Sequence, residues 1–192
     1  MPYHFTNIQI IVAAVAFVVV ALVAVTAYLQ HRKAKTAKLR NRFGSEYERA
    51  VVEHGSSRKA EAKLADRKTR VEALKIRELG ATERERFVAE WQTVQSRFVD
   101  HPNAAVTEAD DLIVALLEAR GYPKGDFEQR AADVSVTYPR VMANFRLANA
   151  IAVRPGRTEA STEELRTAMI KYRAIFDELV APLSFQEKKS AA

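Results

Sequence analysis

Charged side chains that could take part in acid–base chemistry fall close together in the stretch GYPKGDFEQRAADVSVTYPRV, residues 121–141. They are Asp126, Glu128, Arg130 and Asp133. Paired carboxylates can act as general acid and base where a cleft shifts their pKa values apart. Glu128 and Asp133 are five residues apart, so a helix would not stack them on one line. No nucleophile–base motif lies beside them. An active site in this stretch is therefore the less favoured interpretation.

The same stretch has a local structural explanation. Gly121 and Gly125 are typical of a turn, and Asp126 followed by Gln129 has the spacing of a capping box at the start of a short helix. Pro139 is a favoured first residue of the next helix. We interpret the stretch as a corner between helices. Its candidate interaction residues are Tyr122, Asp126, Glu128, Arg130, Asp133 and Tyr138.

Other signals of catalysis or metal binding are weak. Glu108, Asp110 and Asp111 form a second acidic group, for which a divalent-cation site is the alternative to a solvated helix face. The chain has no cysteine, which excludes disulfides, thiolate metal sites and a cysteine nucleophile. No phosphate-binding glycine loop, zinc-protease, serine-hydrolase or calcium-loop motif occurs. We expect a non-enzymatic protein with no catalytic residue, metal or cofactor; an enzyme with an unrecognised site is the alternative.

Positive charge is concentrated in one part of the chain. The net charge is +6, yet residues 1–30 contain no Asp, Glu, Lys or Arg. Residues 31–81 carry 15 basic and 7 acidic side chains, and residues 82–192 carry 15 and 17. The candidate anionic-lipid contacts are Arg32, Lys33, Lys35, Lys38, Arg40 and Arg42. The simpler interpretation is that these six residues only fix the topology of the chain. No nucleic-acid partner is expected, because residues 82–192 have no excess of basic side chains.

The apolar run IQIIVAAVAFVVVALVAVTAYL, residues 8–29, precedes these charges. Its 22 residues would span about 33 Å as a helix, enough to cross a bilayer core of about 30 Å. It is too long for a signal peptide, and no Lys or Arg comes before it. The Lys/Arg bias predicts that the N-terminus lies outside and the C-terminal part in the cytoplasm. No two Gly, Ala, Ser or Thr residues of the span are four positions apart, so close GxxxG-type helix pairing is not encoded, and homo-oligomerisation stays open.

The spacing of apolar residues in the rest of the chain predicts helices with one apolar stripe each. Ser45 is the expected cap of a helix that ends at residues 55–57, and the basic segment after it is interpreted as a solvated stalk, with coiled-coil pairing as the alternative. Thr82 is expected to open a bundle domain, with Trp91 in its core, and Ser161 to cap its last helix. The predicted fold is all-α, with a tail and transmembrane helix (1–30), a basic juxtamembrane segment and helical stalk (31–81), a helical-bundle domain (82–181) and a disordered tail (182–192).

Two stretches, RFGSEYERAV and GYPKGDFEQRAADVSVTYPRVMANFR, resemble a family of small bacterial proteins with one N-terminal membrane segment and a helical domain. The resemblance covers roughly residues 40–181. It implies a protein of the bacterial inner membrane and carries over no catalytic or binding residue. We therefore expect a single-pass membrane protein that acts as an adaptor, or as an accessory subunit of a larger membrane assembly, with a protein partner and the lipid bilayer as its contacts.

Overall fold

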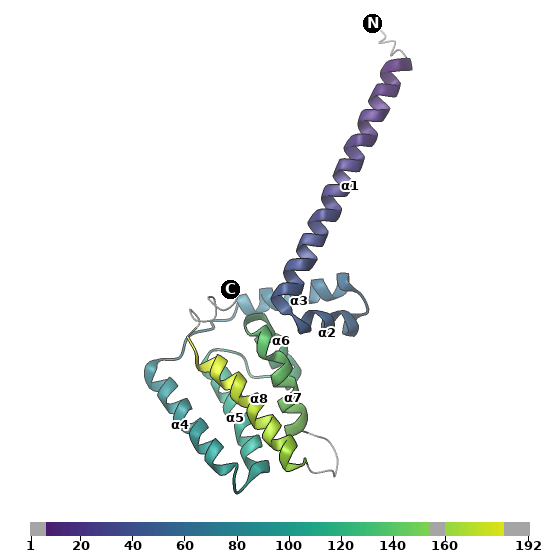
Figure 1. The fold of residues 1–192 in the computed structure, drawn as a ribbon. Helices are drawn as coiled ribbons and strands as arrows, with labels where there is room; N and C mark the ends of the chain where they lie inside the picture. Colours follow the sequence, from purple (N-terminus) through teal and green to yellow (C-terminus); the bar gives the residue numbers. More distant parts are fainter. Residues whose placement is uncertain (1–6, 154–159, 183–192) are drawn as a thin grey trace. The chain divides into compact units, whose positions relative to one another are not determined.

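The computed structural model describes residues 7–153 and 160–182. Within these residues every regular element is a helix, which confirms the predicted all-α fold. The chain divides into two compact units between Arg42 and Phe43, and each unit is described by itself below. Figure 1 draws the helices in chain order.

The first unit is the long helix α1, Asn7–Phe43, whose last residue already belongs to the second unit. Among the described residues, α1 is the one helix long and apolar enough to cross a membrane, by length and composition. Large apolar side chains such as Phe17 and Val20 are exposed along it. The predicted span lies within this helix, which continues without a break through the basic residues that follow.

The second unit begins with a helical hairpin formed by α2, Ser45–His54, and α3, Ser57–Glu72. Gly44 and Gly55 have positive φ angles of 52° and 71°, which favour glycine, and they separate α1, α2 and α3. Gly44, rather than the predicted Ser45, is the N-cap of α2, because the backbone of Gly44 is not helical, with φ 52° and ψ −126°. The buried apolar side chains of the hairpin are Phe43, Tyr47, Ala50, Ala60, Leu64 and Val71.

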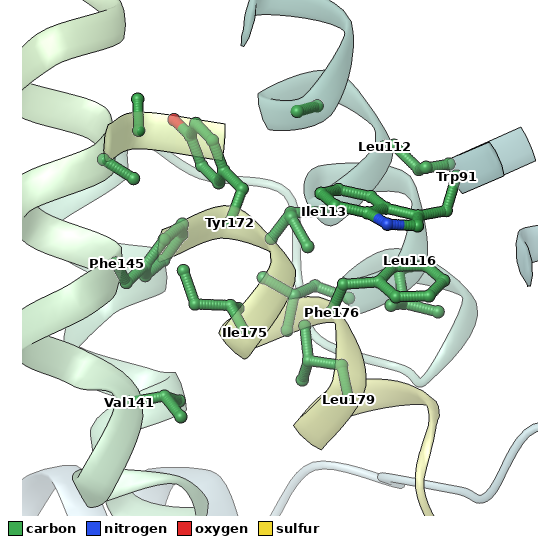
Figure 2. Packing of buried hydrophobic residues seen from close by; sticks show 14 of the residues in the cluster. Trp91, Leu112, Ile113, Leu116, Val141, Phe145, Tyr172, Ile175, Phe176 and Leu179 are labelled. Carbon is green, nitrogen blue, oxygen red and sulfur yellow. The ribbon is translucent and has the colours of Figure 1, made fainter. Parts of the chain in front are cut away.

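The bundle follows the hairpin in the same unit. Its elements are α4 (Ala81–Arg97), α5 (Pro102–Ala119), α6 (Phe127–Thr137), the 3₁₀ turn η1 (Pro139–Val141), α7 (Met142–Ala152) and α8 (Thr162–Val180). Helix α8 packs against both α5 and α7, and α4 packs mainly against α5. Figure 2 shows the resulting core, in which the rings of Trp91 and Phe176 stack with centroids 4.8 Å apart.

Helix starts depend on local hydrogen bonds. The predicted capping box of Ser161 and Glu164 is confirmed, with the Ser161 N–H donating to the Glu164 carboxylate at 2.8 Å. Helix α4 starts one residue before the predicted Thr82, because the Glu83 carboxylate accepts the Gly80 N–H at 3.0 Å and so caps the helix.

The segment predicted to be a solvated stalk is folded onto the bundle. The second compact unit begins at Phe43 rather than at residue 82, and α3 contacts α6. Ala60 and Leu64 form an apolar stripe along α3, and both are fully buried within the unit. The apolar stripe is therefore covered by helices of the same chain. Except for Pro182, the predicted disordered tail lies outside the described residues.

Candidate functional site

The predicted corner contains residues with separate structural roles. Asp126 is the N-cap of α6, as predicted: its Oδ1 accepts the Gln129 N–H at 2.8 Å. Tyr122 and Tyr138 are buried, and the Tyr122 hydroxyl lies 3.1 Å from the Thr137 hydroxyl. These residues hold the turn and the short helix in place.

Asp133 lies on the inner side of α6 and is only 1% exposed. Its Oδ1 accepts a hydrogen bond from Nε of Arg70 in α3 at 2.9 Å, and its Oδ2 accepts one from Gln129 at 3.0 Å. The Arg70 guanidinium also forms an ion pair with this carboxylate. The buried charge of Asp133 is therefore paired, and the pair joins α3 to α6.

Glu128 belongs to a second ion-pair group, centred on Arg146 of α7. Both oxygens of the Glu128 carboxylate accept from Arg146 Nη1, at 3.1 and 2.9 Å, and Arg49 of α2 lies 3.4 Å away. Arg146 also binds Glu46 of α2, which is 3% exposed. Burial of Arg146 opposes its charge, but the hydrogen bonds that it donates to Glu46 and Glu128 outweigh burial and raise its pKa.

We call these two groups together the ionic junction. It consists of Glu46, Arg49, Arg70, Glu128, Gln129, Asp133 and Arg146. Every pair crosses between helices, except that of Gln129 with Asp133 within α6. The junction attaches the α2–α3 hairpin to α6 and α7. Two of the corner acids that suggested acid–base chemistry, Glu128 and Asp133, thus have arginine partners in the fold, and the third, Asp126, caps α6.

A buried arginine that sequence analysis did not single out lies at the end of α5. Arg120 is 1% exposed and donates from Nη1 to the Leu179 carbonyl near the end of α8. Arg84 donates from Nε to the neighbouring Val180 carbonyl at 3.1 Å. Two cations thus satisfy carbonyls at the C-terminal end of α8, where the helix dipole favours positive charge. One feature of the sequence indicates the burial of Arg120: it lies four residues after Leu116 and seven after Ile113, on the buried stripe of α5.

The second acidic group is not gathered into one site. Glu108 pairs with Arg97 at 2.7 Å, and Asp110 accepts a hydrogen bond from the Tyr172 hydroxyl at 2.8 Å. Burial, and then the charge of Asp110, raise the pKa of Tyr172. Within residues 7–153 and 160–182, no three His, Cys, Asp or Glu side chains are placed to hold a metal ion. The divalent-cation alternative therefore has no support in the described part of the chain.

The six basic residues predicted to contact lipid all lie on α1 and are all exposed. Because they span three helical turns between Arg32 and Arg42, they surround the helix rather than marking one face. We call this set the basic collar. Such a ring of guanidinium and ammonium groups can meet phosphate groups in every direction around the helix.

A groove of about 490 Å³ lies between α4 and α8. Its residues include the stacked and buried Trp91 and Phe176, with the apolar side chains of Val88, Val180 and Pro182 beside them. Polar side chains also line it: Arg84, Gln92, Gln95, Arg173 and Asp177. The predicted place of Trp91 in the core is confirmed, whereas nothing in the sequence indicates the groove.

No protein-family model, curated protein or solved structure matches the chain. The class of the protein is therefore defined by its own structure. It is an all-α protein in which a candidate membrane helix leads into a compact unit of a hairpin and a helical bundle.

Proposed function

We propose that this protein is a membrane-anchored adaptor whose groove between α4 and α8 binds a helical segment of a partner protein. The groove is the observation that carries the proposal, because an apolar surface edged by polar groups is how many grooves bind amphipathic helices. Val88 supports it, since 36% of this apolar side chain is left exposed at the groove.

The lining also favours a particular chemistry in the occupant. Two guanidinium groups, of Arg84 and Arg173, line the groove with a single carboxylate, that of Asp177. Arg84 is occupied by main-chain carbonyls, and Arg173 lies 3.3 Å from Asp177 and 3.0 Å from Gln95. A partner helix with apolar residues at i, i+3 or i+4 and i+7, flanked by an acidic residue, would complement this net positive lining.

A crosslinking experiment tests the groove. A photo-crosslinking amino acid placed at Val88 should form an adduct with a partner protein in cells, whereas the same group at Val99, which is 84% exposed outside the groove, should not. The crosslinked peptide should carry the apolar spacing of an amphipathic helix. Introducing Val180→Glu into the Val88 crosslinking chain should abolish the adduct.

Two results would contradict this proposal. Equal adducts from Val88 and Val99 would show that the crosslinker reports only exposure. An adduct between two copies of the chain would assign the groove to self-association and not to a partner.

The anchor in this proposal is α1, placed in the bacterial inner membrane with the N-terminus outside and the second unit in the cytoplasm. The exposed apolar surface of α1 and the charge asymmetry on its two sides support this orientation. A reporter that is active only outside the cytoplasm, fused after Ala192, should be silent, and the same reporter fused before residue 8 should be active. The opposite pattern would reverse the topology.

Contact of the basic collar with anionic lipid is a second candidate function. It is favoured by the exposure of all six basic side chains directly after the apolar part of α1. Native mass spectrometry of the chain, released from nanodiscs of mixed phosphatidylcholine and phosphatidylglycerol, should find the anionic lipid retained preferentially. Replacing the six residues by glutamine should remove this preference; an unchanged preference would exclude the collar as its source.

A further inference from the structure

We infer that the α2–α3 hairpin binds anionic lipid headgroups through a cationic face of α3, formed by Arg58, Lys59, Lys63 and Arg67. The inference rests on the proposed membrane anchoring of α1 and is independent of the groove between α4 and α8. It assigns a lipid contact to the folded second unit, beyond the basic collar of α1.

Ion pairs distinguish the other two basic residues of α3 from these four. Arg70 pairs with Asp133, and Lys68 lies 3.4 Å from Glu72. No carboxylate of the described residues pairs with the remaining four, of which Arg67 is half-buried and the others exposed. Glu61 and Asp66 lie in the same stretch of α3, so residues 58–67 keep a net charge of +2. The face therefore offers cations that the fold itself leaves uncompensated.

The placement of these cations does not stabilise α3. Lys59, Lys63 and Arg67 follow one another at four-residue spacing, at which like charges repel on a helix. Arg58 and Lys59 also lie in the first turn, where the helix dipole disfavours positive charge and where α3 has no acidic residue. An anionic surface would relieve both the repulsion and the unfavourable dipole interaction, which is the physical reason to expect an anionic ligand.

Chain connectivity keeps the hairpin close to such a surface. Fourteen residues separate the predicted end of the apolar run, at Leu29, from Gly44, and they are helical, so they extend about 21 Å. The headgroup layer itself is about 5–7 Å thick, and electrostatic attraction persists for about 8 Å at physiological salt. The tether thus limits the distance between Gly44 and the hydrocarbon core to about 21 Å. Because this exceeds the sum of the two lengths, contact of α3 with the headgroups requires α1 to tilt.

Charge in the rest of the chain favours the hairpin over the bundle as the lipid contact. Helix α3 carries six basic and three acidic residues, whereas residues 82–192 carry 15 basic and 17 acidic residues. A negative surface potential therefore attracts α3 and weakly repels the bundle. The Arg70–Asp133 pair fixes α3 to α6, so the face is presented by a folded unit rather than by a loose segment.

The absence of cysteine makes a direct test simple, because one introduced cysteine can be labelled specifically. Ala62 is exposed on α3, three residues after Lys59 and four after Arg58. A fluorophore on Ala62→Cys in the full chain, reconstituted into nanodiscs with a quencher attached to lipid headgroups, reports contact with the surface. Quenching should be stronger in discs with phosphatidylglycerol than in discs of phosphatidylcholine alone, and added salt should remove the difference.

Charge variants separate the proposed face from general electrostatics. Neutralising all four cations to glutamine should abolish the dependence of quenching on anionic lipid, because each cation contributes a roughly fivefold factor to the ratio of bound to unbound hairpin. The matched control neutralises four basic residues of the bundle, namely Arg86, Lys124, Arg166 and Lys171, and should leave Ala62 quenching unchanged. A label on Ala104→Cys, exposed on α5, should show no dependence on anionic lipid.

Several outcomes would overturn the inference. One is equal quenching of the Ala62 label in both lipids, and another is an equal loss of quenching in the bundle control. A third is a fluorescence response of the label to an RNA oligonucleotide but not to anionic lipid. If a neutralised variant misfolds, the salt dependence of quenching in the Ala62→Cys chain that keeps all four cations still tests the inference. Failure of α1 to insert would appear separately, as absence of the chain from the nanodiscs, and would contradict the anchoring itself.

Discussion

Arg146 of α7 and Glu46 of α2, one hundred residues apart in the chain, face each other through two parallel hydrogen bonds. The Nε–Oε1 distance is 2.9 Å and the Nη2–Oε2 distance is 3.1 Å. This bidentate pair lies at the centre of the ionic junction, where 16% of the Arg146 side chain and 3% of the Glu46 side chain are exposed. Geometry of this kind adds orientation to attraction, so the pair also sets how the hairpin meets the bundle.

Removing Glu46 should therefore destabilise the second unit. We expect Glu46→Ala to lower the free energy of unfolding by about 3 kcal/mol, the lower end of the range for breaking a buried pair, because Glu128 can still pair with Arg146. Denaturant unfolding of residues 43–192, which make up the second unit, measures the change. The control is Glu53→Ala, exposed on the same helix, and an equal loss in both variants would contradict a role of the ion pair.

Acid should weaken the start of α4 through Glu83. A hydrogen bond from Arg77, and then one from the Gly80 N–H, lower the pKa of Glu83 from 4.5 to about 2. Because the folded-state pKa is depressed, the stabilisation is present above the unfolded-state pKa and is lost as the pH falls from about 4.5 towards 2. The stability difference between the natural chain and Glu83→Gln should thus be present at pH 6 and vanish near pH 2. A difference that is constant across this pH range would exclude Glu83 as its source.

Asp126 should matter as a helix cap. Because its Oδ1 accepts the Gln129 N–H, Asp126→Ala should cost about 1 kcal/mol, within the range of about 0.5–2 kcal/mol for lost caps. Asp126→Asn keeps an acceptor oxygen and should cost much less. Thermal unfolding of both variants measures this. Normal folding of Asp126→Asn and Glu128→Gln, together with loss of the cellular function, would instead identify a site in this corner.

Gly121 should be the least replaceable glycine of the turn. Its φ angle is +96°, and a Cβ added there would lie 2.6 Å from the Lys75 carbonyl oxygen. Left-handed backbone costs other residues roughly 1–2 kcal/mol, and the clash with main-chain atoms adds to it, so Gly121→Ala should cost at least about 2 kcal/mol. Gly125→Ala is the matched control, because its closest contact is the flexible Gln129 side chain at 3.2 Å. Equal effects of the two changes would contradict this explanation.

Trp91 should be a main stabiliser of the bundle. It is 2% exposed and stacks on Phe176, so Trp91→Ala should lower the free energy of unfolding by about 3–5 kcal/mol. Trp91→Phe keeps an aromatic ring and should lose less. Denaturant unfolding provides the measurement, with the exposed Val99→Ala as the control. An unchanged denaturant midpoint for Trp91→Ala would show that Trp91 does not stabilise the core.

Features that depend on neighbouring residues could be predicted from the amino-acid sequence. The apolar run within α1, the all-α composition, and the caps at Asp126 and Ser161 follow from periodicity and from hydrogen bonds that span three or four residues. Helix starts were less secure, as at α4, which begins at Ala81 and is capped by Glu83 instead of beginning at the predicted Thr82. There, several residues of suitable type compete within one turn.

Features that depend on residues far apart in the chain could not be predicted and are visible only in the fold. Glu46 could not be matched with Arg146, nor Asp133 with Arg70, because attraction between charges is non-specific until the fold brings one pair together and excludes water from it. The same holds for α3, whose stripe of Ala60 and Leu64 is compatible with a stalk, a coiled coil or a packed hairpin. Which of these forms depends on the surface that covers the stripe, and that surface is provided by α2 and α6, the latter more than fifty residues further along the chain.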